Sequence, residues 1–480
     1  MKKLLCALLT AALLAGCAPA TAGNTPLSPE AVTIRLSDDG VEFLEASGIT
    51  VASDILYREE DHSAEEAAKH TVVHISAPGT YVLTGRLSAG QIAVDLGENA
   101  KNDPGAVVTL ILDQAEIACS VAPAILFYNV YECGNAEAPA AAVDTSAAGA
   151  NVILAAGSWN QIQGSHVAKI RKPGTDETLH KYDAALYSKM SMNIGGEGFL
   201  DILADNEGLG TELHLTVNSG TIAIRSGNDG INTNADGVSV TTVNGGTLRI
   251  EVTGETGEGD GIDSNGWLVI NGGNVFAHGC GSSMDAGIDA DLGIHINGGT
   301  VVATGNMSDR IEDGGQTYAV FQFAQRQEPG VFTLKNAGEE VVLERAVPNS
   351  FDCLLLSAPE LTEGTYTLWS GDTRFQGAVG GAGMGNFFGE IPPVERPDWP
   401  GGDDGAVQIP PQPTMPLLPQ GEPPVDMPQA DFSEGFPPGR MPSGPLPGGD
   451  AAPSIREHVL STDFPIRDGA NFFGFLQRAE

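Results

Sequence analysis

Aspartate and asparagine residues recur at fixed positions in three copies of one short motif. The copies are NDGINTN at residues 228–234, GDGIDSN at 259–265 and DAGIDAD at 285–291, and a degenerate first copy, EGLGTE, covers 207–212. Their side chains offer carboxylate and amide oxygens, which are the ligands that a hard cation such as calcium prefers. The motif therefore indicates metal binding.

Alignment of the copies on their aliphatic residue, which we expect to point inward, produces three columns of mostly polar residues. The columns contain Glu207, Asp229, Asp260 and Ala286, then Gly210, Asn232, Asp263 and Asp289, then Glu212, Asn234, Asn265 and Asp291. Carboxylates stacked one repeat apart repel one another, and a cation relieves that repulsion. We therefore predict calcium ligands at Asp229, Asn232, Asp260, Asp263, Asn265, Asp289 and Asp291. The alternative is that these residues only form turns and side-chain ladders, with protons or water easing the repulsion.

These motifs belong to a longer repeat that organises residues 217–303. A Val/Ile-Asn-(Ser/Gly)-Gly sequence occurs in each repeat, with its asparagine at Asn218, Asn244, Asn271 and Asn297, spaced 26, 27 and 26 residues apart. A fixed period of this size indicates a solenoid. We interpret the asparagine column as an internal hydrogen-bonded ladder that also forms a turn, and not as a ligand site.

Short strands must position the motifs, because apolar residues alternate on both sides of the Asn-Gly turns. Leu215 and Val217 precede the first turn, and Ile222 and Ile224 follow it. Such alternation is typical of strands with one buried face. A repeat of about 26 residues fits one coil of a parallel β-helix better than a propeller blade of about 40–45 residues. Because crossovers between parallel strands are right-handed, we predict an all-β, right-handed parallel β-helix.

The N-terminus has the features of a bacterial lipoprotein signal peptide over residues 1–16. A short apolar run follows two lysines and ends in a lipobox at Cys17. We expect cleavage before Cys17 and lipidation of its thiol, which would hold the protein at the extracellular face of the cell membrane. Residues 17–50 would form the anchor tether and lead-in.

The rest of the chain divides by composition. We predict the β-helix over residues 51–377, with irregular N-terminal coils, regular coils at 184–306 and a terminal strand cap at 307–377. Residues 378–453 are rich in proline and glycine and lack the apolar residues of a core, so we expect this segment to be disordered. Residues 454–480 regain strand character and form a tail that is expected to dock on the β-helix.

Two features are candidates for direct contact with a sugar chain. The insertion predicted at residues 159–182 is basic, and Lys169, Arg171 and Lys172 could meet an acidic polymer. A solvated surface loop is the alternative. Trp267 is expected to point outward beside Leu268 and could stack on a sugar ring, although a surface tryptophan without that role fits equally well.

The net charge limits the possible partners, and the cysteines bear on disulfide formation. The formal net charge of −38 argues against nucleic acid as a partner. An extracellular location permits disulfides, and a local bridge between Cys119 and Cys133 is plausible. Cys280 and Cys353 are expected to be buried small hydrophobic residues.

Several stretches together match one known family: GTYVLTG with QIAVD in residues 79–95, AALYSK at 184–189, the Asp-Gly-Ile copies, and INGG at 270–273. Over about residues 50–377 the sequence resembles bacterial extracellular carbohydrate-binding proteins whose right-handed parallel β-helix is related to polysaccharide lyases. The resemblance implies calcium along the coils and binding of plant cell-wall polymers such as polygalacturonate and cellulose. It carries Asp229, Asp260 and Asp263 over as ligands, whereas Ala286 and Gly210 depart from the pattern.

The predicted function is therefore a non-catalytic, cell-surface lipoprotein that binds an acidic polysaccharide with calcium. One alternative is a calcium-dependent polysaccharide lyase, whose base would be Lys189, Arg225, Arg249 or Arg310. The other alternative is a structural adhesin or stalk without sugar specificity.

Overall fold

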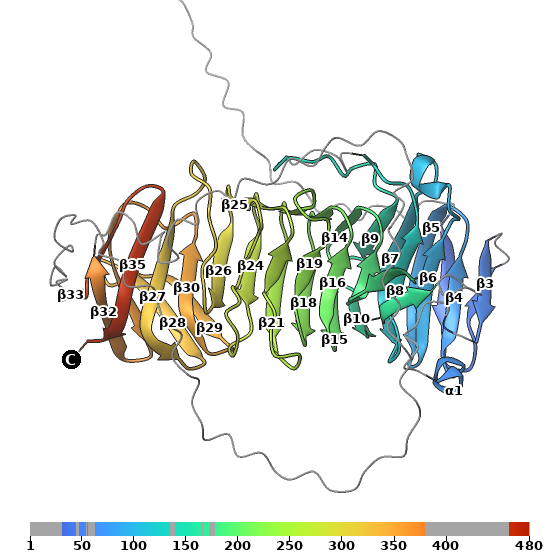
Figure 1. Cartoon of the computed structure of the whole chain (residues 1–480), viewed down its shortest axis with the longest axis horizontal. Coiled ribbons are helices and arrows are strands. Elements are labelled where there is room, and N and C mark those ends of the chain that lie inside the picture. Colours follow the sequence, from blue (N-terminus) through green and yellow to red (C-terminus); the bar gives the residue numbers. More distant parts are fainter. Residues whose placement is uncertain are drawn as a thin grey trace, which may run out of the picture. The chain divides into compact units, whose positions relative to one another are not determined.

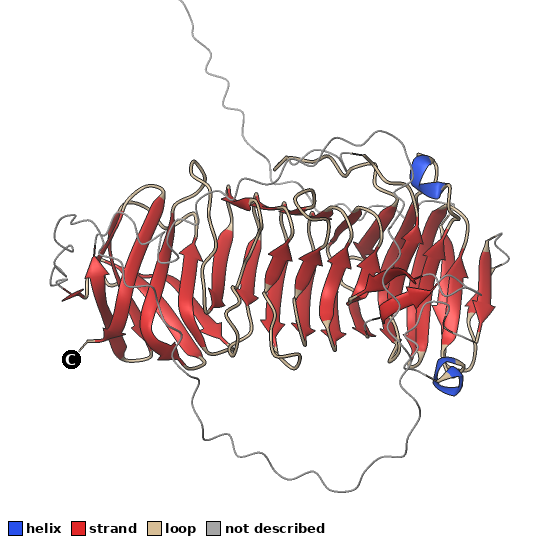
Figure 2. Ribbon diagram, in the orientation of Figure 1, coloured by secondary structure: helices blue, strands red, loops and turns tan. Residues whose placement is uncertain are grey.

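The chain folds almost entirely into strands. The computed structural model describes residues 31–44, 48–53, 55, 63–134, 140–165, 167–171, 178–379 and 460–479. These residues belong to one compact unit. Within them the helical elements are α1 (Ala64–Ala67) and the 3₁₀ turn η1 (Ala100–Asn102), and neither is long and apolar enough to cross a membrane (Figure 2). The prediction of an all-β protein is confirmed.

Three rows of parallel strands run through this unit (Figure 1). Row A consists of β9 (Ala150–Leu154), β14 (Met192–Gly196), β17 (Leu215–Val217), β20 (Val240–Val243), β23 (Trp267–Ile270) and β25 (Gly293–Ile296). Row B consists of β10 (Trp159–Gly164), β15 (Phe199–Ala204), β18 (Thr221–Ser226), β21 (Thr247–Val252), β24 (Asn274–His278) and β26 (Thr300–Gly305). Row C consists of β4 (Thr71–Ile75), β6 (Gly90–Asp95), β8 (Ile125–Asn129), β13 (Ala184–Ser188), β16 (Glu207–Thr211), β19 (Ile231–Thr233) and β22 (Ile262–Ser264).

The register of row A equals the sequence repeat. Val217 pairs with Val243, Val243 with Ile270, and Ile270 with Ile296, so equivalent residues of successive repeats lie side by side. The alternating apolar residues around each turn are buried, as predicted. Parallel rows with this register account for the period, while the complete right-handed β-helix stays a prediction.

An Asn-Gly turn connects each of the last four strands of row A, from β17 to β25, to the following strand of row B. Gly246 shows why glycine is required there, because its φ of +81° belongs to the left-handed region. A Cβ at this position would also lie only 2.5 Å from the carbonyl oxygen of Gly220 in the preceding repeat. Any larger residue would therefore push two repeats apart.

The N-terminal part adds longer strands to the same rows. Strand β7 (Val108–Ala118) pairs with β9 and with β10, and on its other edge with β5 (Gly79–Leu87), which in turn pairs with β1 (Val32–Leu36). At the end of row C, β3 (Ile49–Ala52) pairs antiparallel with β4.

The insertion predicted at residues 159–182 begins later than expected. Trp159–Gly164 is strand β10 of row B, because its alternating side chains pack between β7 and β15. Only β11 (Val167–Arg171) and β12 (Thr178–Tyr182) form a separate antiparallel hairpin. Within the hairpin Lys169 and Arg171 lie on the β11 backbone, and the structure describes no side chains for them; Lys172 lies outside the described residues.

Strands of mixed direction close the C-terminal end. They are β27 (Tyr318–Gln327), β28 (Gly330–Asn336), β29 (Val341–Val347), β30 (Phe351–Ser357), β31 (Gly364–Ser370), β32 (Thr373–Val379), β33 (Leu460–Ser461), β34 (Phe464–Ile466) and β35 (Ala470–Arg478). Strand β30 pairs antiparallel with β26, and β35 pairs with β27 and β32. Phenylalanines from these strands, including Phe321 and Phe351, form a second apolar core.

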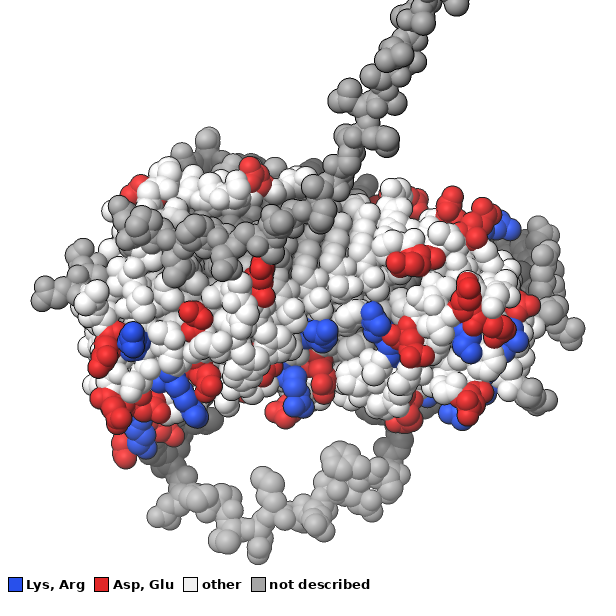
Figure 3. All heavy atoms as spheres, turned by 180° about the vertical axis from the view of Figure 1, so that it is seen from behind, with Lys and Arg blue, Asp and Glu red and all other residues white. Residues whose placement is uncertain are grey.

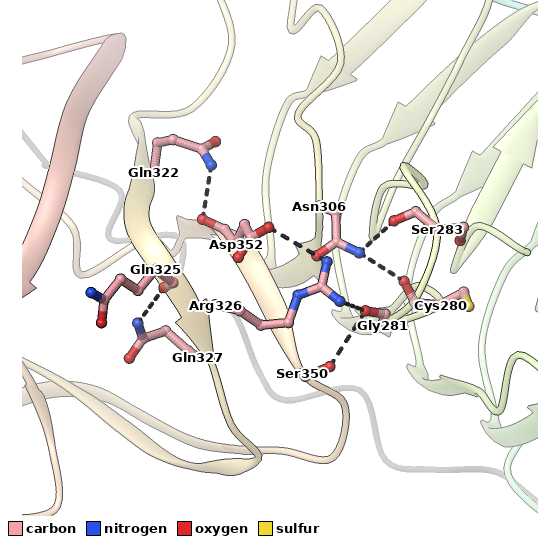
Figure 4. Close-up of polar contacts among 10 residues, drawn as sticks. All are labelled: Cys280, Gly281, Ser283, Asn306, Gln322, Gln325, Arg326, Gln327, Ser350 and Asp352. Carbon is pink, nitrogen blue, oxygen red and sulfur yellow. Dashed lines mark hydrogen bonds and ion pairs between the residues drawn. The ribbon is translucent and has the colours of Figure 1, made fainter. Parts of the chain in front are cut away.

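Polar contacts join this end to the repeats (Figure 4). The Asn306 side chain donates hydrogen bonds to the carbonyl oxygens of Cys280 and Ser283. Arg326 donates to the carbonyl oxygen of Gly281 and forms a 3.5 Å ion pair with Asp352. The turn after β24 is thus held from both sides.

The four cysteines in the described residues are free thiols, so the Cys119–Cys133 bridge is wrong. Cys119 is buried in the main core after β7, where burial raises its thiol pKa to about 11. Cys133 lies beyond β8 with its thiol directed to the Glu132 carboxylate. Cys280 and Cys353 are buried, as predicted. Residues 1–16, Cys17 and residues 380–459 of the Pro/Gly-rich segment and tail lie outside the described residues.

Candidate functional site

Row C positions the Asp-Gly-Ile motifs. Ile231 pairs with Ile262, Asn232 pairs with Asp263, and a further bridge joins Ile262 to Ile288. The aliphatic residues of the motif are buried in the core, so the polar residue that follows each one points away from it. Asn232, Asp263 and Asp289 each come directly after one of these aliphatic residues, so they lie next to one another in successive repeats.

Three carboxylates meet at this place. Oxygen atoms of Asp260, Asp263 and Asp289 all lie within 4.8 Å of one another. Asp260 comes from the column that precedes the aliphatic residue, and the other two come from the column that follows it. Two of the predicted columns therefore converge on one point rather than forming separate sites.

Burial raises the pKa of these carboxyl groups. The pKa is about 9 for Asp260 and about 7 for Asp229, Asp263 and Asp289. Burial is the largest cause, backbone hydrogen bonds oppose it at Asp229 and Asp260, and neighbouring carboxylates add to it. At neutral pH this cluster needs protons or a cation to compensate its charge.

The column formed by Asp229, Asp260 and Ala286 is linked through the backbone. Asp229 accepts a 2.7 Å hydrogen bond from the N–H of Asp260, and Asp260 accepts one of 2.5 Å from the N–H of Ala286. Each carboxylate thus satisfies the next repeat's backbone with one oxygen. Ala286 cannot continue the series because it has no side-chain oxygen.

Asn232 supplies a further oxygen next to the carboxylates. Its side-chain N–H₂ group donates to Glu207 at 3.0 Å and to Asp229 at 3.4 Å. Its amide oxygen is buried and has no hydrogen-bond partner among the described residues. A buried acceptor without a donor, beside three carboxylates, fits a hard cation.

Four of the seven predicted ligands are not members of the three-carboxylate group: Asp229 and Asn232, described above, and Asn265 and Asp291 of the third column. Asn265 donates its side-chain N–H₂ group to the carbonyl oxygen of Asn234 and to the Asp236 carboxylate. Asp291 is exposed, although its charge contributes to the raised pKa of Asp263 and Asp289. The third column therefore lies further out than the other two.

The sequence analysis missed Asp309. Burial raises its pKa, and its charge in turn contributes to the raised pKa of Asp289 and Asp263. Its carboxylate accepts a hydrogen bond from the N–H of Ala290 at 3.0 Å. The surrounding sequence, MSDRI, has no Gly-Ile pair, so the repeat pattern gave no signal for it.

The asparagine column forms the predicted ladder. Asn244 donates to Asn218 at 2.9 Å, Asn271 to Asn244 at 2.9 Å, and Asn297 to Asn271 at 2.8 Å. These side chains are exposed, so the expectation of an internal ladder is wrong in its location. The Asn-Gly turns put the ladder on the outer side of the bend between rows A and B.

A groove of about 870 Å³ lies beside the ladder, on the outward side of row A. Its lining includes the ladder itself, Thr216, Thr242 and the segment 141–146. Thr145 ties that segment to row A, because its hydroxyl group hydrogen-bonds to Asn193 and Thr216 at 2.7 Å each. The groove therefore presents amide and hydroxyl groups along successive strands.

Trp267 is less accessible than predicted. It is half-buried at the start of β23, and its ring stacks on that of His295 with centroids 5.2 Å apart. Its indole N–H is buried and has no partner among the described residues. One face of the ring is thus covered by His295, which itself lines the groove.

Charged side chains are unevenly distributed over the surface. Figure 3 shows a face on which acidic and basic groups gather toward one long edge and the two ends, leaving a broad area without either. The part of this face that the structure describes thus combines uncharged surface with local clusters of charge. Stacked strands of this kind define a class of repeat protein that presents extended surfaces.

The chain belongs to the family of carbohydrate-binding domain-containing proteins, whose model matches residues 69–324. Among solved structures, it is similar to a polysaccharide lyase-like protein from C. thermocellum, solved as a gadolinium derivative. The two are 20% identical over 56% of this chain and 83% of that chain, with a TM-score of 0.37, a likeness too small to support an inference about activity. No curated protein matches the chain.

Proposed function

We propose that this carbohydrate-binding protein is a non-catalytic, calcium-dependent binder of acidic polysaccharide, such as the polygalacturonate of plant cell walls. The single observation that carries this proposal is the convergence of Asp260, Asp263 and Asp289 within 4.8 Å. Such a cluster is costly to maintain in an acidic protein unless a cation compensates it.

Asp260, Asp263, Asp289 and the amide oxygen of Asn232 would hold the calcium ion. Bound calcium would supply positive charge to a surface that otherwise repels uronate carboxylates. The residues themselves fix the arrangement, because Asp260 is oriented by the Ala286 N–H and Asn232 by Glu207. This explains how a chain with a net charge of −38 could hold an acidic polymer.

The repeat-length register of the three rows supports a right-handed parallel β-helix as the scaffold. An experimental structure that traced β17, β18 and β19 as one right-handed turn would test this proposal. A left-handed or discontinuous path would contradict it. We further propose that lipidation at Cys17 places the scaffold at the extracellular face of the cell membrane, which mass spectrometry of the membrane fraction would test.

The alternative of a polysaccharide lyase is less well supported. Arg310 is paired with Glu312, and Arg225 is paired with Glu251. Lys189 lies 4.6 Å from the centroid of the Tyr128 ring, and burial lowers its pKa. A half-buried lysine of this kind could act as a base. However, a lyase needs its base beside the calcium ion, and Lys189 follows β13, whereas the three-carboxylate group is built from later repeats.

Calorimetric titration of the soluble protein tests the proposed function. We expect saturable calcium binding and, after calcium loading, binding of polygalacturonate that EDTA strongly weakens. Absence of calcium binding would contradict the metal site. Release of unsaturated uronate products during the titration would replace the binder with a lyase.

A further inference from the structure

A second concave surface, of about 680 Å³, lies on the outward side of row B. We call it the arginine basin because its lining includes Arg225 on β18, Arg249 on β21 and Arg345 on β29. The strand register fixes the floor: Arg249 lies between Ala223 and Phe276, and Glu251 lies between Arg225 and His278. It therefore groups cationic side chains on a chain dominated by acids.

The wall of the arginine basin is held rigidly. Residues 345–348 line it, and Asn349, which follows them, donates hydrogen bonds to the carbonyl oxygens of Val252, His278 and Gly279 at 2.7–3.2 Å. Ser350 donates to the carbonyl oxygen of Gly281 (Figure 4). These bonds fasten the wall to the ends of β21 and β24, so the concavity is built into the fold.

Two of the three guanidinium groups are available to a ligand. Arg225 forms a 3.7 Å ion pair with Glu251. Arg249 is exposed, and its side chain has no hydrogen bond or ion pair among the described residues. Arg345 is exposed and lies over the Phe276 ring at 4.7 Å from the centroid, which fixes the plane of its guanidinium group. Its Nη1 group donates a 2.7 Å hydrogen bond to the carbonyl oxygen of Glu344, so its other N–H groups are the ones left for a ligand.

The acids of the basin are already engaged. Glu251 is paired with Arg225, and Asp201 accepts a 3.0 Å hydrogen bond from Gln161. His278 is buried and bonded to the Thr304 hydroxyl group. Three arginines against the two carboxylates, Glu251 and Asp201, leave the basin a net positive charge. Guanidinium groups also match the planar geometry of a carboxylate.

We propose that the arginine basin binds the carboxylate of a uronic acid residue, with Arg249 and Arg345 as its partners. This inference rests on the proposed function and adds to it a direct, metal-independent contact. The three-carboxylate group and the basin would then recognise an acidic polymer in two different ways. The basin would discriminate acidic chains from neutral ones, because an unpaired guanidinium group gains nothing comparable from a hydroxyl group.

The test is binding of a defined oligogalacturonate to the intact soluble protein, measured by calorimetry with calcium and with EDTA. We expect Arg249→Glu to weaken binding about tenfold or more under both conditions, because a charge-assisted contact becomes a repulsion. Arg345→Gln should weaken it less, since the amide keeps hydrogen-bonding capacity. Arg86→Glu is the matched control: it makes the same charge change at an exposed arginine outside the basin.

The possible outcomes distinguish a failure of the arginine basin from a failure of the proposed function. Weakening by Arg249→Glu but not by Arg86→Glu, with unchanged melting temperatures, supports the basin. Equal affinities of the two variants overturn it while leaving the proposed function intact. Absence of binding by the wild-type protein overturns both. A neutral cello-oligosaccharide bound as tightly as the uronate, and equally by Arg249→Glu, also overturns the proposed specificity.

Discussion

The asparagine ladder and the carboxylate columns share one repeat period, yet they satisfy their polar atoms differently. Each inner ladder amide both donates and accepts: Asn271, for example, donates to Asn244 and accepts from Asn297. A carboxylate only accepts. Asp260 therefore takes one donor from the backbone and otherwise faces other acids. The comparison teaches that amides in a column can serve one another as donor and acceptor. Carboxylates in a column cannot, so they need a proton or a cation.

The largest expected effect comes from removing carboxylates of the three-carboxylate group. Replacement of both Asp263 and Asp289 by alanine should lower calcium affinity by well over tenfold, because two of the three converging carboxylates are lost. Calorimetric calcium titration measures this change. Asp372→Ala, at an exposed acid outside the cluster, is the control. Unchanged affinity in the double variant would mean that the cluster is not the metal site.

The pH dependence of stability should distinguish the columns next. The folded-state pKa values of about 7 to 9 exceed the unfolded value of about 3.9, so the folded protein without metal binds more protons in this range. Stability is therefore full below pH 4 for these groups and is lost as pH rises through 7 to 9. Each extra proton changes the free energy of unfolding by about 1.4 kcal/mol per pH unit.

Thermal unfolding at pH 5 and pH 8 measures that dependence. We expect the metal-free protein to melt at a lower temperature at pH 8, and added calcium to restore much of the loss. Asp260→Asn should flatten the dependence, because the neutral amide does not titrate, and Asp372→Asn should not. An identical pH profile for wild-type protein and Asp260→Asn would refute this explanation.

The smallest effect should come from placing a carboxylate in the asparagine ladder. Asn271→Asp removes the donor to Asn244 and places two acceptors face to face, so we expect a loss of about 1 kcal/mol at neutral pH. The loss should shrink near pH 3, where the protonated acid can donate again. Denaturant unfolding at both pH values measures this difference. Asn271→Ala is the control, because its loss of stability relative to the wild-type protein should be the same at both pH values.

Much of the scaffold was predictable because it depends on local spacing. The period placed Leu215, Ile231 and Ile262 in the core, and it placed Asp263 and Asp289 on adjacent rungs. Equivalent positions of successive repeats carry similar residue types, so one copy predicts the next. The asparagine ladder followed from the same rule, although its exposure depends on which side of the bend the amide occupies.

The rest depends on contacts between distant segments. Asp309 joins the acidic cluster from beyond the last motif, and segment 141–146 reaches the groove through Thr145. Arg345 enters the basin from a strand almost one hundred residues after Arg249. No period connects these positions. Sequence alone likewise placed β10 in a loop, because its single tryptophan and glutamines obscured the alternation.

The antiparallel pairing of β30 with β26 has a consequence for self-association. A stack of parallel strands ends in unpaired backbone groups, and such an edge can recruit another copy of the same stack and grow into a fibre. Here row B meets a strand of opposite direction that carries a different sequence, and β27 covers that strand in turn. Row B is thereby given a fixed length, and its last strand keeps an edge that a second copy of the chain cannot extend.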